Sequence, residues 1–163
     1  MTLRLDDLYL YHAKLRGHPT DCAKCGAISL QRSSHISPVK ADIDHDGEAT
    51  STQVLWSHQD ATVFDVIDSN RLTEDGAEAV ALSYVHFKAA WVVKRRLQRG
   101  ESADWLLNNA SGWLALEVSG TVSGDPLARL AEKKEQVSRC TLPAQRLAIV
   151  VAFNNPSILV STP

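Results

Sequence analysis

The sequence predicts an α/β fold, and the order of the elements between residues 71 and 163 is the main reason. An amphipathic helical stretch comes first, three short apolar segments follow, and a second helix leads into a continuous apolar run. The order is therefore helix, three strands, helix, strand. A chain of 163 residues is about one domain in length, enough to bury a core without disulfides or metals.

The first helix is expected from residue 73 to residue 88. Thr73 can cap it, and Glu74 and Asp75 lie in the first turn, where the helix dipole favours acidic groups. The apolar residues at helical spacing are Ala77, Val80, Ala81, Tyr84, Val85 and Phe87.

Residues 89–97, 103–107 and 112–120 are rich in apolar and β-branched residues, which predicts three strands, with a hairpin loop joining the last two. Asp125 and Pro126 predict the start of the second helix, because proline is favoured in the first turn. Residues 147–153 predict a buried strand that ends before the Asn-Asn-Pro sequence.

Residues 1–70 are expected to be a β-rich region packed on this core. Residues 27–36 and 39–46 suggest two strands. Asp46-Gly47 is a plausible hairpin turn before a third strand at 51–57.

The composition is that of an ordinary globular protein, with 44% hydrophobic and 22% charged residues. No run approaches the ~20 apolar residues that span a bilayer, and no signal peptide begins the chain, so we expect a cytoplasmic protein with no membrane partner. Three cysteines do not make a secreted disulfide framework. The four tryptophans lie mostly in apolar segments and are expected in the core.

The net charge of −2 does not favour a nucleic-acid partner, but its distribution is uneven. Residues 86–100 contain five basic side chains and no acidic one. They are Lys88, Lys94, Arg95, Arg96 and Arg99. The segment is either a local positive surface or an ordinary solvated strand with its turn.

Two carboxylates carry the strongest chemical signal. Asp104 opens the strand at 103–107, and Glu117 lies inside an otherwise apolar strand, where burial of a charge is costly without a partner. A hairpin of this loop length would place both near the same end of neighbouring strands. Two converging carboxylates make a hard oxygen site suited to Mg²⁺ or Mn²⁺.

Asp104 followed by Glu117-Val118-Ser119 resembles the signature of the PD-(D/E)XK superfamily, and the surrounding order of elements is similar. The resemblance covers about residues 71–153 and implies a restriction-endonuclease-like core. Glu78 stands where the Holliday-junction-resolvase and RecB-like branches carry a helix glutamate. The basic strand Lys94-Arg95-Arg96 and the turn at Arg99 are also similar to those branches.

The chain departs from the signature at Ser119, which takes the place of the family's lysine and cannot carry its charge. In the superfamily, the next helix can supply that lysine, which would be Lys134 or Lys133 here. Leu127, Ala131 and their apolar neighbours define a helix face that includes Lys134 and leaves Lys133 at its edge. We therefore place Lys134 first and Lys133 second, with a lysine that merely extends off the helix edge as the alternative for each.

The resemblance implies a metal-dependent nuclease acting on nucleic acid, DNA before RNA, in DNA processing or phage defence. Asp104 and Glu117 would bind the ion, Glu78 and a lysine would assist catalysis, and the basic strand would contact phosphates. It also implies a homodimer or a partner protein. The alternative is a catalytically inactive nuclease-fold module that binds within a larger assembly, which Ser119 and the acidic net charge favour.

Cys22 and Cys25 form one C-x-x-C pair, which supplies only two of the four ligands of a structural zinc site. His12, His18, His35 and His45 could add ligands, but none lies at an established spacing. We rank unpaired cysteines first, a zinc-stabilised binding protein second and a redox motif third.

Overall fold

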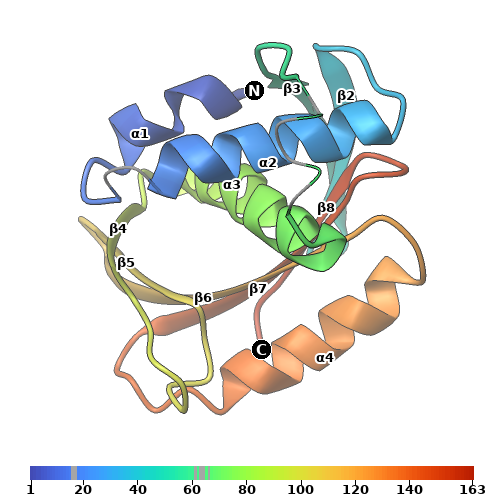
Figure 1. Ribbon diagram of the computed structural model, residues 1–163. Coiled ribbons are helices and arrows are strands. Elements are labelled where there is room, and N and C mark those ends of the chain that lie inside the picture. The colour runs from blue at the N-terminus through green and yellow to red at the C-terminus, as the bar shows by residue number, and fades with distance from the viewer. Residues whose placement is uncertain (16–17, 61, 63–64, 66) are drawn as a thin grey trace.

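The computed structural model describes residues 1–15, 18–60, 62, 65 and 67–163, with the backbone alone at 18–20. One mixed sheet of eight strands runs through the described part, in the order β1-β3-β2-β8-β7-β6-β5-β4. Helix α3 crosses one face with α2 outside it, and α4 covers the other face (Figure 1). The α/β class that the sequence predicts is confirmed.

The carboxy-terminal half has the predicted order of elements. It contains α3 (Ser69–Ala89), β4 (Val92–Arg96), β5 (Trp105–Asn109), β6 (Gly112–Thr121), α4 (Pro126–Ser138) and β7 (Gln145–Ala152). Strands β4, β5 and β6 are antiparallel neighbours, and β7 runs parallel to β6 after the crossover through α4. A further strand that the sequence did not indicate, β8 (Ser157–Ser161), follows the Asn-Asn-Pro turn.

The start of α3 differs from the prediction. Its N-cap is Asp68, whose Oδ1 accepts the backbone N–H groups of Asn70 and Arg71 at 3.0 and 3.1 Å. Thr73 lies one turn inside the helix, and its hydroxyl donates to the carbonyl of Ser69. Asp68 is a better cap than Thr73 because its side chain accepts hydrogen bonds from two N–H groups of the first helical turn.

The amino-terminal part is less β-rich than expected. Strands β1 (Thr2–Arg4), β2 (Val39–His45) and β3 (Glu48–Leu55) are present, with a short 3₁₀ helix η1 (Leu5–Asp7) and the one-turn helix α1 (Leu8–Tyr11). The strand predicted at 27–36 is wrong, because most of it belongs to α2 (His18–Arg32). Almost every residue from 22 to 30 is buried, so the segment shows no apolar period that would reveal a helix.

The Asp46-Gly47 turn between β2 and β3 is confirmed. Both residues have positive φ, 51° and 88°, as a two-residue hairpin turn of this kind requires. Strand β2 also pairs in parallel with β8, so the amino-terminal strands belong to the same sheet as the rest of the chain.

The core lies mainly between the sheet and α3. Strand β6 approaches α3 so closely that a Cβ at Gly120 would overlap the carbonyl oxygen of Thr73, which requires glycine there. Three of the four tryptophans are buried as predicted, whereas Trp113 is 44% exposed at the start of β6. The prediction of a core position was wrong for Trp113, because only one face of that strand end is covered by α3.

Candidate functional site

The candidate site lies where β6 extends beyond β5. The last pair in the β5–β6 register is Trp105 with Leu116, so within the described residues no strand pairs with the rest of β6 on that side. Asp104 Oδ2 accepts the N–H of Val118 at 2.9 Å, and Glu74 Oε2 accepts the N–H of Gly120 at 2.9 Å. Side-chain carboxylates therefore accept the backbone N–H groups at this edge of β6, and these hydrogen bonds bring the carboxylates together there.

Glu117 is the most deeply buried member of the site, at 1% exposed. Its Oε1 accepts a hydrogen bond from Lys133 Nζ at 2.6 Å. Within the described residues, no group donates a hydrogen bond to its Oε2, which is also buried. A buried carboxylate oxygen that accepts no hydrogen bond either destabilises the folded protein or is available to coordinate a metal ion.

Burial and the nearby charge of Asp104 together raise the pKa of Glu117 to about 7, although Lys133 acts in the opposite direction. Burial also raises the pKa of Asp104, against the stabilising N–H of Val118. The two carboxyl groups therefore titrate as a pair, and protonation of one allows a hydrogen bond to the other. The structure brings together the two acids that the sequence singled out.

Glu78 lies next to this pair and is 5% exposed. Its Oε1 accepts from Arg96 at 2.8 Å, and its Oε2 accepts from the Cys22 thiol at 3.8 Å. The charge of Glu78 raises the pKa of Asp104, which places the helix glutamate within electrostatic reach of the carboxylate pair. Arg96 also lies over the Trp105 ring, 4.8 Å from its centroid.

Lys133 contacts Glu117, whereas Lys134, our first choice, has no hydrogen bond or ion pair among the described residues. Leu127 is exposed, and Leu130 and Val137 are the apolar residues of α4 that pack on the sheet. The face of α4 that meets β6 is therefore rotated toward Lys133.

Ser119, where the sequence resemblance implies a lysine, is fully buried, and its hydroxyl both donates and accepts a hydrogen bond. It donates to Glu74 Oε1 at 3.0 Å and accepts from Arg129 Nε at 2.6 Å. Arg129 also donates to Glu74 Oε1 at 2.8 Å. A guanidinium from α4 therefore reaches the place where the signature would put an ammonium.

Sequence reasoning did not identify Glu74 and Arg129 as members of the site. The available signal was the spacing of Arg129 and Lys133, which are four residues apart and so project from one face of α4. Glu74 had been assigned to the first turn of a helix, where an acidic residue has an ordinary explanation.

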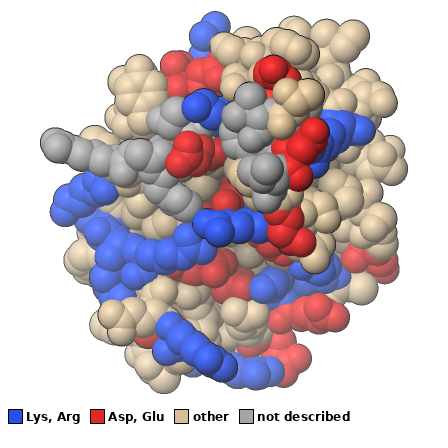
Figure 2. Space-filling model, viewed as in Figure 1, with Lys and Arg blue, Asp and Glu red and all other residues tan. Residues whose placement is uncertain are grey.

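The four cations expected to bind phosphates are not equally available. Arg95 makes two hydrogen bonds to Glu101, at 2.7 and 2.8 Å, and Arg96 is paired with Glu78. Lys94 and Arg99 have no ion pair among the described residues. Figure 2 shows a band of Lys and Arg side chains across one face of the molecule, with Asp and Glu side chains beside the band.

The C-x-x-C pair lies within α2, and both thiols are buried and form no disulfide among the described residues. Burial raises the pKa of Cys25 to about 11 and raises that of Cys22 still more. Cys25 packs with Ile28 and Leu72. In the described part of the chain, the one grouping with metal-ligand spacing is Cys22, Asp75 and Glu78, whose ligand atoms lie within 4.8 Å of one another.

The histidines give no support to a zinc site with Cys25. His12 is buried, with Nε2 near the Leu82 carbonyl and Nδ1 accepting from the Val93 N–H, and burial lowers its pKa to about 4. His35 contacts backbone carbonyls, and His45 contacts Tyr84. The side chain of His18 lies outside the described residues.

The residues at the carboxylate pair fit a hard divalent cation. Glu117 Oε2 accepts no hydrogen bond from the described residues, the Asp104 carboxyl is close enough to couple to Glu117, and both groups offer oxygen ligands.

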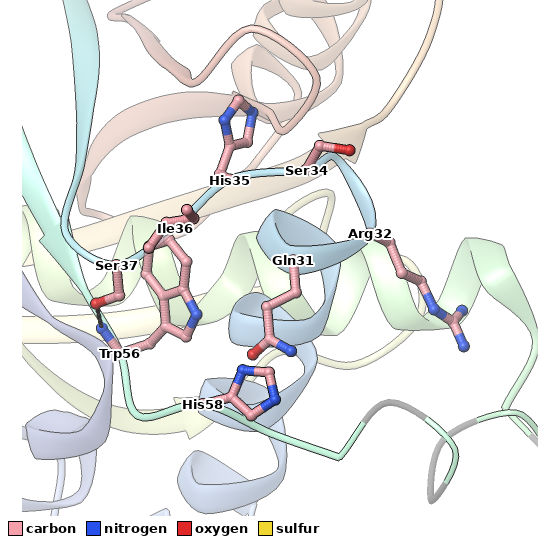
Figure 3. A pocket seen from close by; sticks show the side chains of 8 residues that line it. All are labelled: Gln31, Arg32, Ser34, His35, Ile36, Ser37, Trp56 and His58. Atoms are coloured by element: carbon pink, nitrogen blue, oxygen red, sulfur yellow. Dashed lines mark hydrogen bonds between the residues drawn. The ribbon is translucent and has the colours of Figure 1, made fainter.

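A cavity of about 620 Å³ lies elsewhere, between the end of α2 and the segment after β3 (Figure 3). Its Gln31 side chain is held by the backbone of Gln59 at both ends, and His35 is held by two backbone carbonyls. These groups are occupied in structural hydrogen bonds, so we assign no chemistry to this cavity.

None of the helices in the described part is both long and apolar enough to cross a membrane. Comparison with known proteins adds no assignment, because no family model, no curated protein and no solved structure matches the chain.

Proposed function

We propose that this protein is a metal-dependent nuclease of the restriction-endonuclease-like type, hydrolysing phosphodiester bonds in nucleic acid. One observation carries the proposal: Asp104 and Glu117 converge at the free edge of β6, and among the described residues no group donates a hydrogen bond to the buried Glu117 Oε2. An Mg²⁺ or Mn²⁺ ion would supply charge stabilisation and an acidified water.

The chain's own residues would divide the remaining work. Asp104 and Glu117 would hold the ion, and the N–H of Val118 fixes the orientation of Asp104. Lys133, 23% exposed and 2.6 Å from Glu117, would turn toward the attacking water or the phosphate once its carboxylate partner binds a cation. Glu78 would assist from α3, and Lys94 and Arg99 would contact the nucleic-acid backbone.

A second function is favoured by a different observation. Lys133 and Arg96 already neutralise Glu117 and Glu78, and Ser119 is locked between Glu74 and Arg129. Such a closed set of pairs is stable without metal, which fits a nuclease-fold module that binds a partner and does not cleave.

The test is an incubation of purified protein with single-stranded, duplex and branched DNA and with RNA, in Mg²⁺ or Mn²⁺. Asp104→Asn and Glu117→Gln should abolish cleavage, while Glu132→Gln, an exposed acid on α4, should retain it. Absence of cleavage together with absence of Mn²⁺ binding by calorimetry would reject the nuclease and favour the binding module.

A further inference from the structure

A second cavity of about 430 Å³ lies beneath the carboxy-terminal half of α3. It opens where β2 and β8 end and where β6 and β7 begin. Buried apolar side chains form much of its lining, namely Val85, Trp91, Leu114 and Leu147. Glu74, at the other end of α3, belongs to the candidate nuclease site, so the two places are separate.

A fixed polar pair faces the same cavity. His45 Nδ1 lies 2.7 Å from the Tyr84 hydroxyl, and His45 Nε2 lies 3.9 Å from Asp46 Oδ2. Asp46 in turn accepts hydrogen bonds from Ser161 and Thr162, so it is held in place at the turn after β2. The Tyr84 hydroxyl is therefore oriented before any ligand arrives.

Two cations complete the lining. Lys88 has no hydrogen bond or ion pair among the described residues, and Arg146 uses only Nε, which donates to the Cys140 carbonyl at 3.0 Å. No aspartate or glutamate is among the described residues that line the cavity. Positive charge without a facing acid selects for an anionic ligand.

We propose that this cavity binds a small organic anion with a flat apolar body, such as an aromatic carboxylate or a nucleotide phosphate. The ring would lie against Trp91, Leu114 and Leu147, and the anionic group would reach Arg146, Lys88 and the Tyr84 hydroxyl. The volume is within the range of small-molecule sites, which are mostly apolar with a few convergent polar groups. This site does not depend on the nuclease proposal.

The experiment compares naphthalene-2-carboxylate with naphthalene-2-carboxamide, which has the same ring and no charge, by ¹H–¹⁵N correlation spectroscopy and calorimetry. Adenosine 5′-monophosphate is the phosphate-bearing probe. We expect at least one anionic probe to bind, to shift the Trp91 indole signal, and to bind about tenfold more tightly than the amide if a charged hydrogen bond is made.

Variants locate the site. Arg146→Gln and Lys88→Gln should each weaken the anionic probe about fivefold or more and leave the amide unchanged, while Lys40→Gln on the outer part of the sheet should bind as the parent does. Equal affinity for charged and neutral probes, loss of binding in Lys40→Gln, or no binding of either anion would overturn the proposal.

Discussion

Lys133 on α4 donates a 2.6 Å hydrogen bond to Glu117 on β6, sixteen residues earlier in the chain. The contact holds a buried carboxyl group that is also electrostatically coupled to the Asp104 carboxyl group. The single ammonium group of Lys133 therefore faces two coupled carboxyl groups, those of Glu117 and Asp104. The balance of these charges depends on pH, which makes it measurable.

Lys133→Met should destabilise the protein in a pH-dependent way. Above pH 7, the substitution leaves Glu117 ionised and buried without its cation, a loss of about 3 kcal/mol for a broken buried pair, less what proton uptake recovers. At pH 5, Glu117 is protonated and the loss should be small. Urea unfolding at both pH values measures this. Lys134→Met, which breaks no contact among the described residues, is the matched control; equal effects of the two substitutions would contradict the geometry.

Glu117→Gln should remove a pH dependence from the free energy of unfolding. The pKa of Glu117 is about 7 in the folded protein and near its ordinary value when unfolded, so between about pH 4.5 and 7 the folded state holds the extra proton. Stability from this group is complete below pH 4.5 and is lost as pH rises through 7, by about 3 kcal/mol at most. The variant should lack this fall. Parallel curves for parent and variant between pH 4.5 and 8 would argue against the raised pKa.

Metal binding should strengthen with pH. A cation at Asp104 and Glu117 must displace the proton that the pair shares, so the Mn²⁺ affinity should rise by up to about tenfold per unit below pH 7 and level off above it. Calorimetry at pH 6, 7 and 8 in buffers of different ionisation enthalpy gives both affinity and proton release. A flat affinity would contradict ion binding at Asp104 and Glu117.

His12 should make the fold sensitive to acid. Its pKa is lowered to about 4 in the folded protein, so below about pH 6.5 the unfolded chain binds the proton more readily. Stability from this group is complete above pH 6.5 and falls by about 3 kcal/mol as pH drops through 4. His12→Gln should flatten that part of the curve in chemical denaturation. An unchanged slope in the variant would indicate that His12 is accessible to protons in the native state.

Nucleic-acid affinity, if present, should depend on the unpaired cations. Lys94→Gln and Arg99→Gln together should reduce the slope of log affinity against log salt by about 2, because each releases roughly one counterion on phosphate contact. Arg95→Gln should change the slope less, since Glu101 already holds its guanidinium. Filter binding from 50 to 300 mM salt tests this. A larger effect of Arg95 than of the other two would show that its ion pair opens on binding.

The sequence predicted most of the carboxy-terminal half because its signals are local. The Asp125-Pro126 start of α4 and the apolar run of β7 need no knowledge of distant contacts. The proximity of Asp104 and Glu117 also followed from the short hairpin between them.

The errors arose where tertiary contacts decide the outcome. Helix α2 is buried on nearly all sides, so its apolar residues lose their period. The orientation of α4 could not be read from its apolar residues, because Leu127 remains exposed and shifts the apparent face toward Lys134. Arg129 and Glu74 meet across 55 positions of sequence, and no local pattern reports such a pair.

The parallel pairing of β2 with β8 has a consequence for how the chain folds. Asp46 bonds to Ser161 across 115 positions of sequence, so strands β1 to β3 can join the main sheet only after β8 exists. The segment from α3 to β7 can form its hairpins and crossover earlier from nearer contacts. Because closing long loops slows folding, we expect the amino-terminal strands to dock last, with their pairing edge exposed to other chains until then.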